Sequence, residues 1–333
     1  MAAPGHIESL ITRFWLNNGK LAENYFQDVP LLTALYKGKK SINRGYDLVQ
    51  RITNGKADFK WYSRLDTLDR TEADFATEAK WDWKHAMASI VIAGTDMRRA
   101  NTKEDMLSLV DSTMENCINT GKAEFNKALF LSTSTGAYAK APEGFAVKFD
   151  AGTTACGGLD STEVALWAPQ RSTGGIAITT DATLLAFKKA MIDDVVDNAS
   201  PGARPDVIVT TRAVANKIAL IGLGKVNIVQ PSDKVSGGKK YADLGFSGVS
   251  LDGVPVIVDT DCPAGCAYSF NSENNMKLLI HPDANFSPLG GDDGKKVKLL
   301  RLPNQDAYAI DLVLQCQLVI KERRALGFAS SVS

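Results

Sequence analysis

Two runs of alternating residues between positions 54 and 84 constrain the fold of this chain more than any other feature. Every second position of 59–65 and of 75–83 is mainly aromatic or apolar, and the positions between them are mainly polar. An alternation with a period of two predicts a strand that has one apolar face. The segment 66–74 between the two runs is polar and charged. The pattern therefore predicts a long hairpin with a charged tip.

The aromatic face of this hairpin needs a partner surface, because an isolated two-stranded hairpin is at best marginally stable in water. The sequence leaves two alternatives for this partner surface: the hairpin's own domain, or a neighbouring subunit. On the second interpretation, the contacts between subunits are made by Phe59, Trp61, Leu65, Arg70, Phe75, Trp81 and Trp83.

A long amphipathic helix is predicted over 102–131, where Thr102 can cap the first turn and Asp105 follows three residues later. Such a helix would span about 45 Å. Its single apolar stripe indicates that it lies along a sheet or another surface. A coiled coil is the competing interpretation, but strict heptads do not persist. The stripe consists of Met106, Val110, Met114, Cys117, Ile118, Gly121, Phe125, Ala128 and Leu129.

The region 176–285 predicts a separate α/β unit, after a stretch of loops and short strands over 132–175. Thr180 or Asp181 can cap a helix that runs to about Asn198. A buried strand is predicted next, and then a second helix. These two elements are expected over 206–210 and 211–221.

The rest of the chain predicts mainly strands. Asp252-Gly253 stands between two apolar runs and is a strong signal for a hairpin turn. Asp259, Asp261 and Asp283 are expected to be turn residues. Further strands are predicted over 266–271 and 276–281. After a polar turn at 290–294, strands are predicted over 297–302 and over the long alternating segment 307–320.

Residues 1–53 are interpreted as an N-terminal arm. Apolar residues at helical spacing predict a short amphipathic helix near its start, at Ile7, Leu10, Ile11 and Phe14. The stretch 37–51 is basic, with Asp47 as its only acidic residue. It is either a solvated surface or an arm that makes nonspecific phosphate contacts, and the DNA-facing candidates are Lys37, Lys39, Lys40 and Arg44.

Charge and cysteine content narrow the class of protein. The 333 residues include 38 basic and 38 acidic side chains, and this balance argues against a dedicated nucleic-acid binder. The five cysteines are scattered and odd in number, which favours reduced thiols over a disulfide framework. The N-terminus lacks the pattern of a signal peptide, and the apolar runs are too short to cross a membrane. We therefore expect the chain to fold in the cytoplasm.

The motifs of common catalytic sites are incomplete. The three histidines, His6, His85 and His281, are far apart in the sequence and have no ligand-spaced neighbours. Cys262 and Cys266 are separated by three residues and indicate a turn rather than a metal site. The glycine-rich segments near 222, 245 and 290 match neither a nucleotide-binding loop nor a nucleophile elbow. We predict no catalytic, cofactor-binding or metal-binding residues, and no enzyme activity.

Several segments resemble tailed-bacteriophage major capsid proteins. Residues 254–259, 261–265, 269–273 and 278–282 are similar to the later half of the apical domain of that family. Pro303-Asn304-Gln305-Asp306-Ala307-Tyr308, followed by a long strand, Arg323-Arg324 and Gly327, is similar to its C-terminal segment, and 206–211 and 156–162 followed by Trp167 also fit. The order of elements agrees from end to end, so the resemblance covers nearly the whole chain.

The resemblance implies an α+β Hong Kong 97-type fold. Its parts would be an N-terminal arm (1–53), an extended loop (54–84), a peripheral domain (85–175) with a spine helix at about 102–131, an apical domain (176–285), and returning strands (286–333). It also implies a structural protein whose hexamers and pentamers close into an icosahedral shell around double-stranded DNA. The implied location is the virion, after assembly in the host cytoplasm.

The resemblance also implies partners. These are further copies of the chain, a portal, packaged DNA and a decoration protein, but no membrane and no cofactor. A separate scaffolding protein is expected, because 53 residues before the hairpin are few for a built-in scaffolding segment. Some members crosslink a lysine of the extended loop to an asparagine, and this chemistry is not carried over, because Lys56 and Lys60 have no identifiable partner. Alternatives are an encapsulin-like compartment, an oligomeric enzyme with an unrecognised site, and a tail or adhesion module.

Overall fold

The computed structural model describes residues 29–42, 45, 47–55, 59–64, 67, 76–95, 103–133, 136–150, 154–162, 164–223, 249–288, 300–303 and 305–333. The helices are α2 (Pro30–Lys37), α4 (Lys103–Leu131), α5 (Phe145–Lys148), α6 (Asp181–Lys188), α7 (Asp194–Asn198) and α8 (Arg212–Leu223). The first strands are β1 (Lys40–Ser41), β2 (Asp47–Thr53), β3 (Ala76–Asp82), β4 (Lys84–Ala93), β5 (Gln170–Ser172) and β6 (Val207–Thr210). The later strands are β7 (Ser250–Leu251), β8 (Val254–Val258), β9 (Ala267–Phe270), β10 (Met276–Pro288), β11 (Leu300–Arg301), β12 (Ala307–Ile320) and β13 (Gly327–Ala329).

The long strand predicted over 307–320 is confirmed and forms the centre of a five-stranded sheet. β12 pairs antiparallel with β10 on one side and with β4 on the other, and β1 and β11 complete the sheet. Its alternate residues are buried, including Leu312, Leu314 and Leu318. The strand predicted over 276–281 is also present, but it belongs to this sheet and not to the α/β unit, because its backbone pairs with β12.

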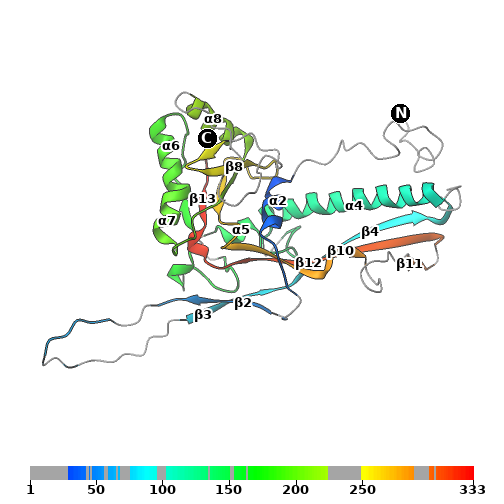
Figure 1. The fold of residues 1–333 in the computed structure, drawn as a ribbon, viewed down its shortest axis with the longest axis horizontal. Helices are drawn as coiled ribbons and strands as arrows, with labels where there is room; N and C mark the ends of the chain where they lie inside the picture. The colour runs from blue at the N-terminus through cyan, green and yellow to red at the C-terminus, as the bar shows by residue number, and fades with distance from the viewer. Residues whose placement is uncertain are drawn as a thin grey trace.

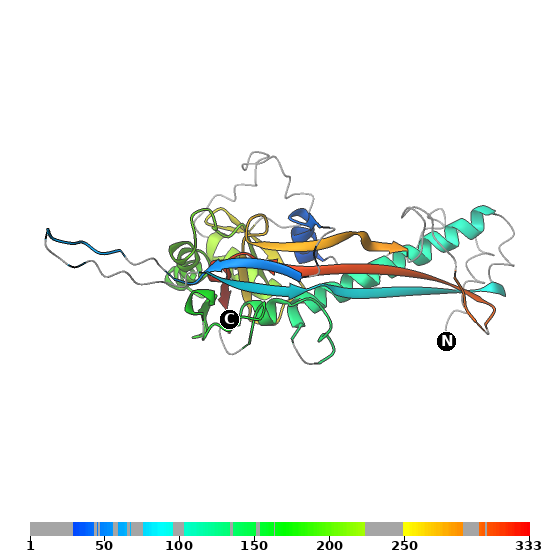
Figure 2. The same cartoon turned by 90° about the horizontal axis from the view of Figure 1, so that it is seen from below.

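The predicted long helix is present as α4, and it lies along β4 and β12 (Figures 1 and 2). Its stripe residues Met114, Cys117 and Ile118 pack against buried isoleucine and leucine side chains of those strands. Farther along, Phe125, Ala128 and Leu129 are buried in the main part of the subunit. The helix is therefore apolar on one side because a sheet covers that side. No helix in the described parts of the chain is long and apolar enough to cross a membrane.

The α/β unit contains a six-stranded sheet in the order β5-β13-β9-β6-β8-β7. Its two faces contribute to different hydrophobic cores. One face packs under α6, α7 and α8, and the other joins the core shared with α4, α5 and the five-stranded sheet. In that shared core the Phe145 ring lies 5.3 Å from Phe130 and 5.1 Å from Tyr268. A continuous core therefore joins the two sheets.

The local signals of the α/β unit are confirmed. The Thr180 side chain caps α6 in a reciprocal pair of hydrogen bonds with Thr183, and a π-helical turn over Lys189–Asp193 joins α6 to α7. Asp252 and Gly253 both adopt positive φ, 51° and 78°, and join β7 to β8. Two adjacent residues of positive φ form the tight turn whose twist matches paired strands.

The hairpin is present, but the prediction of its first strand is wrong. β3 pairs antiparallel with β2, from Asp47 opposite Asp82 to Thr53 opposite Ala76, whereas the described residues 59–64 belong to no strand. The hairpin therefore starts within the segment assigned to the arm. Alternation marks the two faces of an extended segment, but it does not determine which backbone pairs with it. The hairpin projects from one end of the molecule, and the free end of α4, β4 and β12 projects from the other (Figures 1 and 2).

Candidate subunit interface

The root of the hairpin is packed into its own subunit at Trp81. This side chain is only 2% exposed, and its indole Nε1 donates a 2.7 Å hydrogen bond to Oε2 of Glu143. The ring lies 6.4 Å from the ring of Trp167, whose own Nε1 donates to the Cys156 carbonyl at 3.0 Å. Gly157 lies so close that a Cβ there would approach Trp81 to 2.7 Å.

Trp83 also has partners in its own chain. Its Nε1 donates to the Gly45 carbonyl at 3.0 Å, and its ring makes an edge contact with the ring of His281 at 6.2 Å. The structure therefore gives the Trp81 ring partners within its own chain and leaves almost none of it exposed for the predicted contact with another copy. Trp83, which is only partly buried, has the same kind of support within its own subunit.

The outer part of the hairpin is different. Phe59 is 78% exposed, Trp61 is 91% exposed and Tyr62 is 68% exposed. The rings of Phe59 and Trp61 touch each other edge to face at a centroid distance of 5.4 Å. We call this exposed stretch, residues 59–64, the aromatic segment. The other predicted contact residues, Leu65, Arg70 and Phe75, lie outside the described residues.

The predicted DNA-facing residues lie at the start of the described chain. Lys37 ends α2, and Lys39 and Lys40 follow it, all three exposed. The Lys39 ammonium lies 5.1 Å from the centroid of the Tyr36 ring. Arg44 lies outside the described residues. Three exposed cations are thus close together in the chain.

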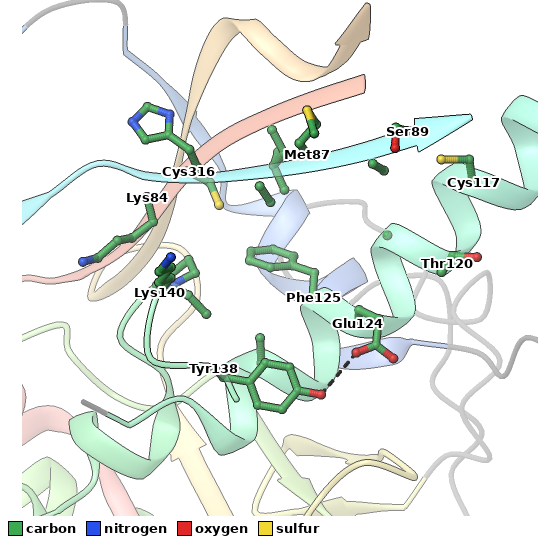
Figure 3. Close-up of a pocket in the computed structure, with 18 of the residues that line it drawn as sticks. Lys84, Met87, Ser89, Cys117, Thr120, Glu124, Phe125, Tyr138, Lys140 and Cys316 are labelled. Carbon is green, nitrogen blue, oxygen red and sulfur yellow. Dashed lines mark hydrogen bonds between the residues drawn. The ribbon is translucent and has the colours of Figure 1, made fainter. Parts of the chain in front are cut away.

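A groove of about 850 Å³ lies between β4, α4 and the loop that follows α4 (Figure 3). Met87, Phe125 and Cys316 are among its apolar lining residues. Two polar lining residues, Tyr138 and Glu124, are engaged with each other, because the Tyr138 hydroxyl donates to Oε2 of Glu124 at 3.2 Å. The groove therefore presents a mainly apolar surface.

The potential metal-ligating side chains in the described parts of the chain are dispersed. No group of three or more His, Cys, Asp or Glu side chains there could hold a metal ion. His85 lies on β4 and His281 on β10, and His6 is outside the described residues. Cys262 and Cys266 lie in a turn, as predicted, with the Cys266 amide donating to the Pro263 carbonyl.

Asp259 was predicted only as a turn residue, but the structure shows that it is a buried carboxylate with several hydrogen bonds. Asp259 is 1% exposed and accepts hydrogen bonds from the backbone of Leu31 and Asp261 and from the amide of Asn126. Burial raises the pKa of the Asp259 carboxyl, and these bonds oppose that rise. The carboxylate ties the start of α2, the C-terminal part of α4 and the end of β8 together. The sequence carried no signal for this role, because its three partners are far apart in the chain.

Comparisons with known proteins agree on the fold. No protein-family model and no curated protein matches the chain. Among solved structures, the capsid asymmetric unit of cyanophage A-1(L) matches with a TM-score of 0.69 and 14% identity, over 94% of this chain and 95% of that chain. The capsid of an empty GTA particle matches with a TM-score of 0.58 and 11% identity, over 100% and 99% of the two chains. The holo-SrpI encapsulin complex of Synechococcus elongatus PCC 7942 matches with a TM-score of 0.57 and 11% identity, over 94% and 90%.

These likenesses establish the fold. The chain has the α+β Hong Kong 97-type fold of phage major capsid proteins over nearly its whole length, as its sequence segments predicted. The matched structures are capsids and an encapsulin, which are structural shells.

Proposed function

We propose that this chain is the major capsid protein of a tailed bacteriophage. Hexamers and pentamers of it would close into an icosahedral shell around double-stranded DNA, in a virion assembled in the host cytoplasm. The observation that carries the proposal is the match to capsid subunits over nearly the full length of both chains.

The exposed aromatic segment supports self-association. A monomeric protein rarely leaves aromatic side chains as exposed as Phe59 and Trp61 at adjacent positions of one face, and such patches mark interfaces. The hairpin and the free end of α4 and β4 project in opposite directions (Figure 2). Head-to-tail contacts between copies can close into rings when the rotation permits. We propose that the aromatic segment packs against the next copy in such a ring.

The partners of the shell belong to the same proposal. A separate scaffolding protein, a portal and a decoration protein are the expected protein partners. Lys37, Lys39 and Lys40, together with Arg44, are the residues proposed to face packaged DNA. Contacts of this kind depend on charge and weaken with salt.

An encapsulin-like compartment is the second candidate, and the match to the SrpI encapsulin favours it. Both candidates predict closed shells, so the contents of the particle separate them. A capsid encloses DNA, whereas an encapsulin encloses a cargo protein.

The test is negative-stain electron microscopy of the purified full chain, expressed with and without the scaffolding candidate. Closed polyhedral shells or capsomer rings are the expected result, and nuclease-protected DNA in particles from infected cells would identify the capsid. Small oligomers of one size under every condition, together with a substrate-dependent activity, would contradict the proposal and favour an enzyme. Tubes or trimers would favour a tail or adhesion module.

A further inference from the structure

An amine is buried beside the root of the hairpin. The Lys148 side chain is fully buried, and its Nζ has no hydrogen-bond partner among the described residues. Its nearest opposite charge is Oε2 of Glu143 at 3.7 Å. Its Nζ also lies 5.5 Å from the centroid of the Trp81 ring.

Glu143 connects this amine to the hairpin. Its Oε2 accepts the Trp81 indole N–H at 2.7 Å and the Gly157 backbone N–H at 3.1 Å. The Gly157 carbonyl in turn accepts the backbone N–H of Lys80 at 2.8 Å. One carboxylate oxygen thus holds β3 and the turn at Gly157 in a fixed relation.

The same lysine is linked to the body of the subunit through its backbone. Its carbonyl accepts a 2.9 Å hydrogen bond from Nε of Arg323, a fully buried side chain that also bonds the carbonyls of Val147 and Trp167. Arg323 stands between β12 and β13. A chain of contacts therefore runs from the hairpin root through Glu143 and Lys148 to the junction of the two sheets.

Burying the Lys148 amine lowers the folding stability of the isolated chain. A buried amine without a hydrogen-bond partner loses its hydration, and a pair at 3.7 Å recovers only part of that loss. Replacing both members of a buried pair with apolar side chains is often neutral or stabilising, whereas removing one member is costly when the other is left buried. Here the remaining carboxylate of Glu143 is 28% exposed and can be hydrated when the amine is removed. Fold stability alone therefore gives no reason for an amine at this position.

We propose that Glu143 and Lys148 are positioning residues that set the direction in which the hairpin leaves the subunit. The ionic contact orients the carboxylate, and the carboxylate holds the Trp81 indole. The role of the pair within the chain does not depend on the proposed function. Its consequence does rest on the proposed function, because a correctly directed hairpin would reach the neighbouring copy.

The test compares Lys148→Met with Lys127→Met, which removes an exposed lysine paired with Glu124. Hydrogen exchange of the full chain is followed in peptides from β2 and β3 and in peptides from β12, together with the melting temperature. In Lys148→Met we expect exchange at least about 10-fold faster in β2 and β3, unchanged exchange in β12, and a melting temperature equal to or above that of the wild type. Lys127→Met is expected to resemble the wild type in all three.

If Lys148→Met does not fold, the same measurements are made on Glu143→Gln. Its side-chain amide keeps one acceptor oxygen for the Trp81 indole but lacks the negative charge. The same local increase in exchange is expected. Unchanged exchange in β2 and β3 overturns the proposal, and so does a uniform increase that extends to β12 with a lower melting temperature. Electron microscopy of the same variants then shows whether malformed shells increase. If the wild type forms no shell, the proposed function fails, while the exchange result still decides the role of the pair.

Discussion

The two ends of the hairpin carry similar side chains in opposite environments. Trp81 at the root is 2% exposed, whereas Trp61 in the aromatic segment is 91% exposed. Trp81 has a hydrogen-bond acceptor, a second indole and a lysine of its own subunit around it. Within the described chain, the ring contact of Trp61 is with the neighbouring ring of Phe59.

This difference separates two roles that one sequence pattern could not separate. Alternation indicated that both tryptophans need a partner surface, and among the described residues the structure covers Trp81 and leaves Trp61 exposed. The root is therefore part of the chain's own fold, and the aromatic segment is the part that we propose packs against another copy. Four experiments can break or sharpen this comparison.

The largest effect is expected for Trp81→Ala. Truncating a buried tryptophan leaves a cavity and takes the indole donor from the Glu143 carboxylate, and we expect a loss of about 3–5 kcal/mol in the free energy of unfolding. Denaturant unfolding of the subunit measures it. Trp61→Ala is the matched control, with an expected change within about 0.5 kcal/mol. Equal losses in the two variants would remove the distinction between root and outer segment.

The double variant Phe59→Ala/Trp61→Ala tests the outer segment. We expect the subunit to unfold as the wild type does, while the concentration needed for assembly rises by roughly 10-fold or more, as for the loss of an aromatic hot spot. Light scattering and electron microscopy of the assembly reaction measure this. Assembly at the wild-type concentration would show that these rings lie outside the contact.

Gly157→Ala tests how tightly the root is packed. A Cβ at Gly157 would approach Trp81 to 2.7 Å, whereas Gly158, also at positive φ, has open space around it. Both substitutions carry backbone strain, so Gly158→Ala is the control. We expect Gly157→Ala to lower the free energy of unfolding by about 1–3 kcal/mol more than the control does. A difference near zero would mean that the root can shift without cost.

The smallest effect is expected from Asp259, which ties α2 to the body away from the hairpin. Its folded pKa is raised above the ordinary value of 3.8 by burial, so the folded state binds the proton more tightly than the unfolded state. The stability this contributes is fully present below pH 3.8 and is lost as the pH rises through the folded pKa. Relative to Asp259→Asn, the wild type should have its largest stability advantage below about pH 4 and lose that advantage as the pH rises through the folded pKa toward neutrality.

Urea denaturation of both proteins across that range measures the difference. A difference that is constant with pH, or that grows as the pH rises, would contradict the raised pKa. The hairpin variants should not change this pH dependence, because the contacts of Asp259 with Leu31, Asn126 and Asp261 do not involve the hairpin.

Local patterns predicted much of the fold. Helix α4, strand β12 and the turn at Asp252-Gly253 were predicted within a residue or two. Each depends on signals carried within a short stretch: one apolar stripe, one alternation, or one pair of turn residues. The quoted segments also predicted the family of folds.

The pairing of distant segments could not be predicted in the same way. β2 was assigned to the arm, although its residues pair with β3 in register from Asp47 to Thr53. β10 was assigned to the α/β unit, although its backbone bonds to β12. Both errors have one cause: a strand's sequence describes its faces, while its partner is chosen by backbone hydrogen bonds to residues far along the chain.

By itself, the sequence determined which segments are helical or extended and which of their faces are apolar, because these properties depend on near neighbours along the chain. Only the tertiary structure decided that Trp81 is covered by its own subunit and Trp61 is not. Only it brought Glu143 and Lys148 to the hairpin root and Asp259 to the start of α2. Burial and buried polar contacts are properties of groups that meet in space, and segments separated by up to hundreds of residues must fold together before those groups meet.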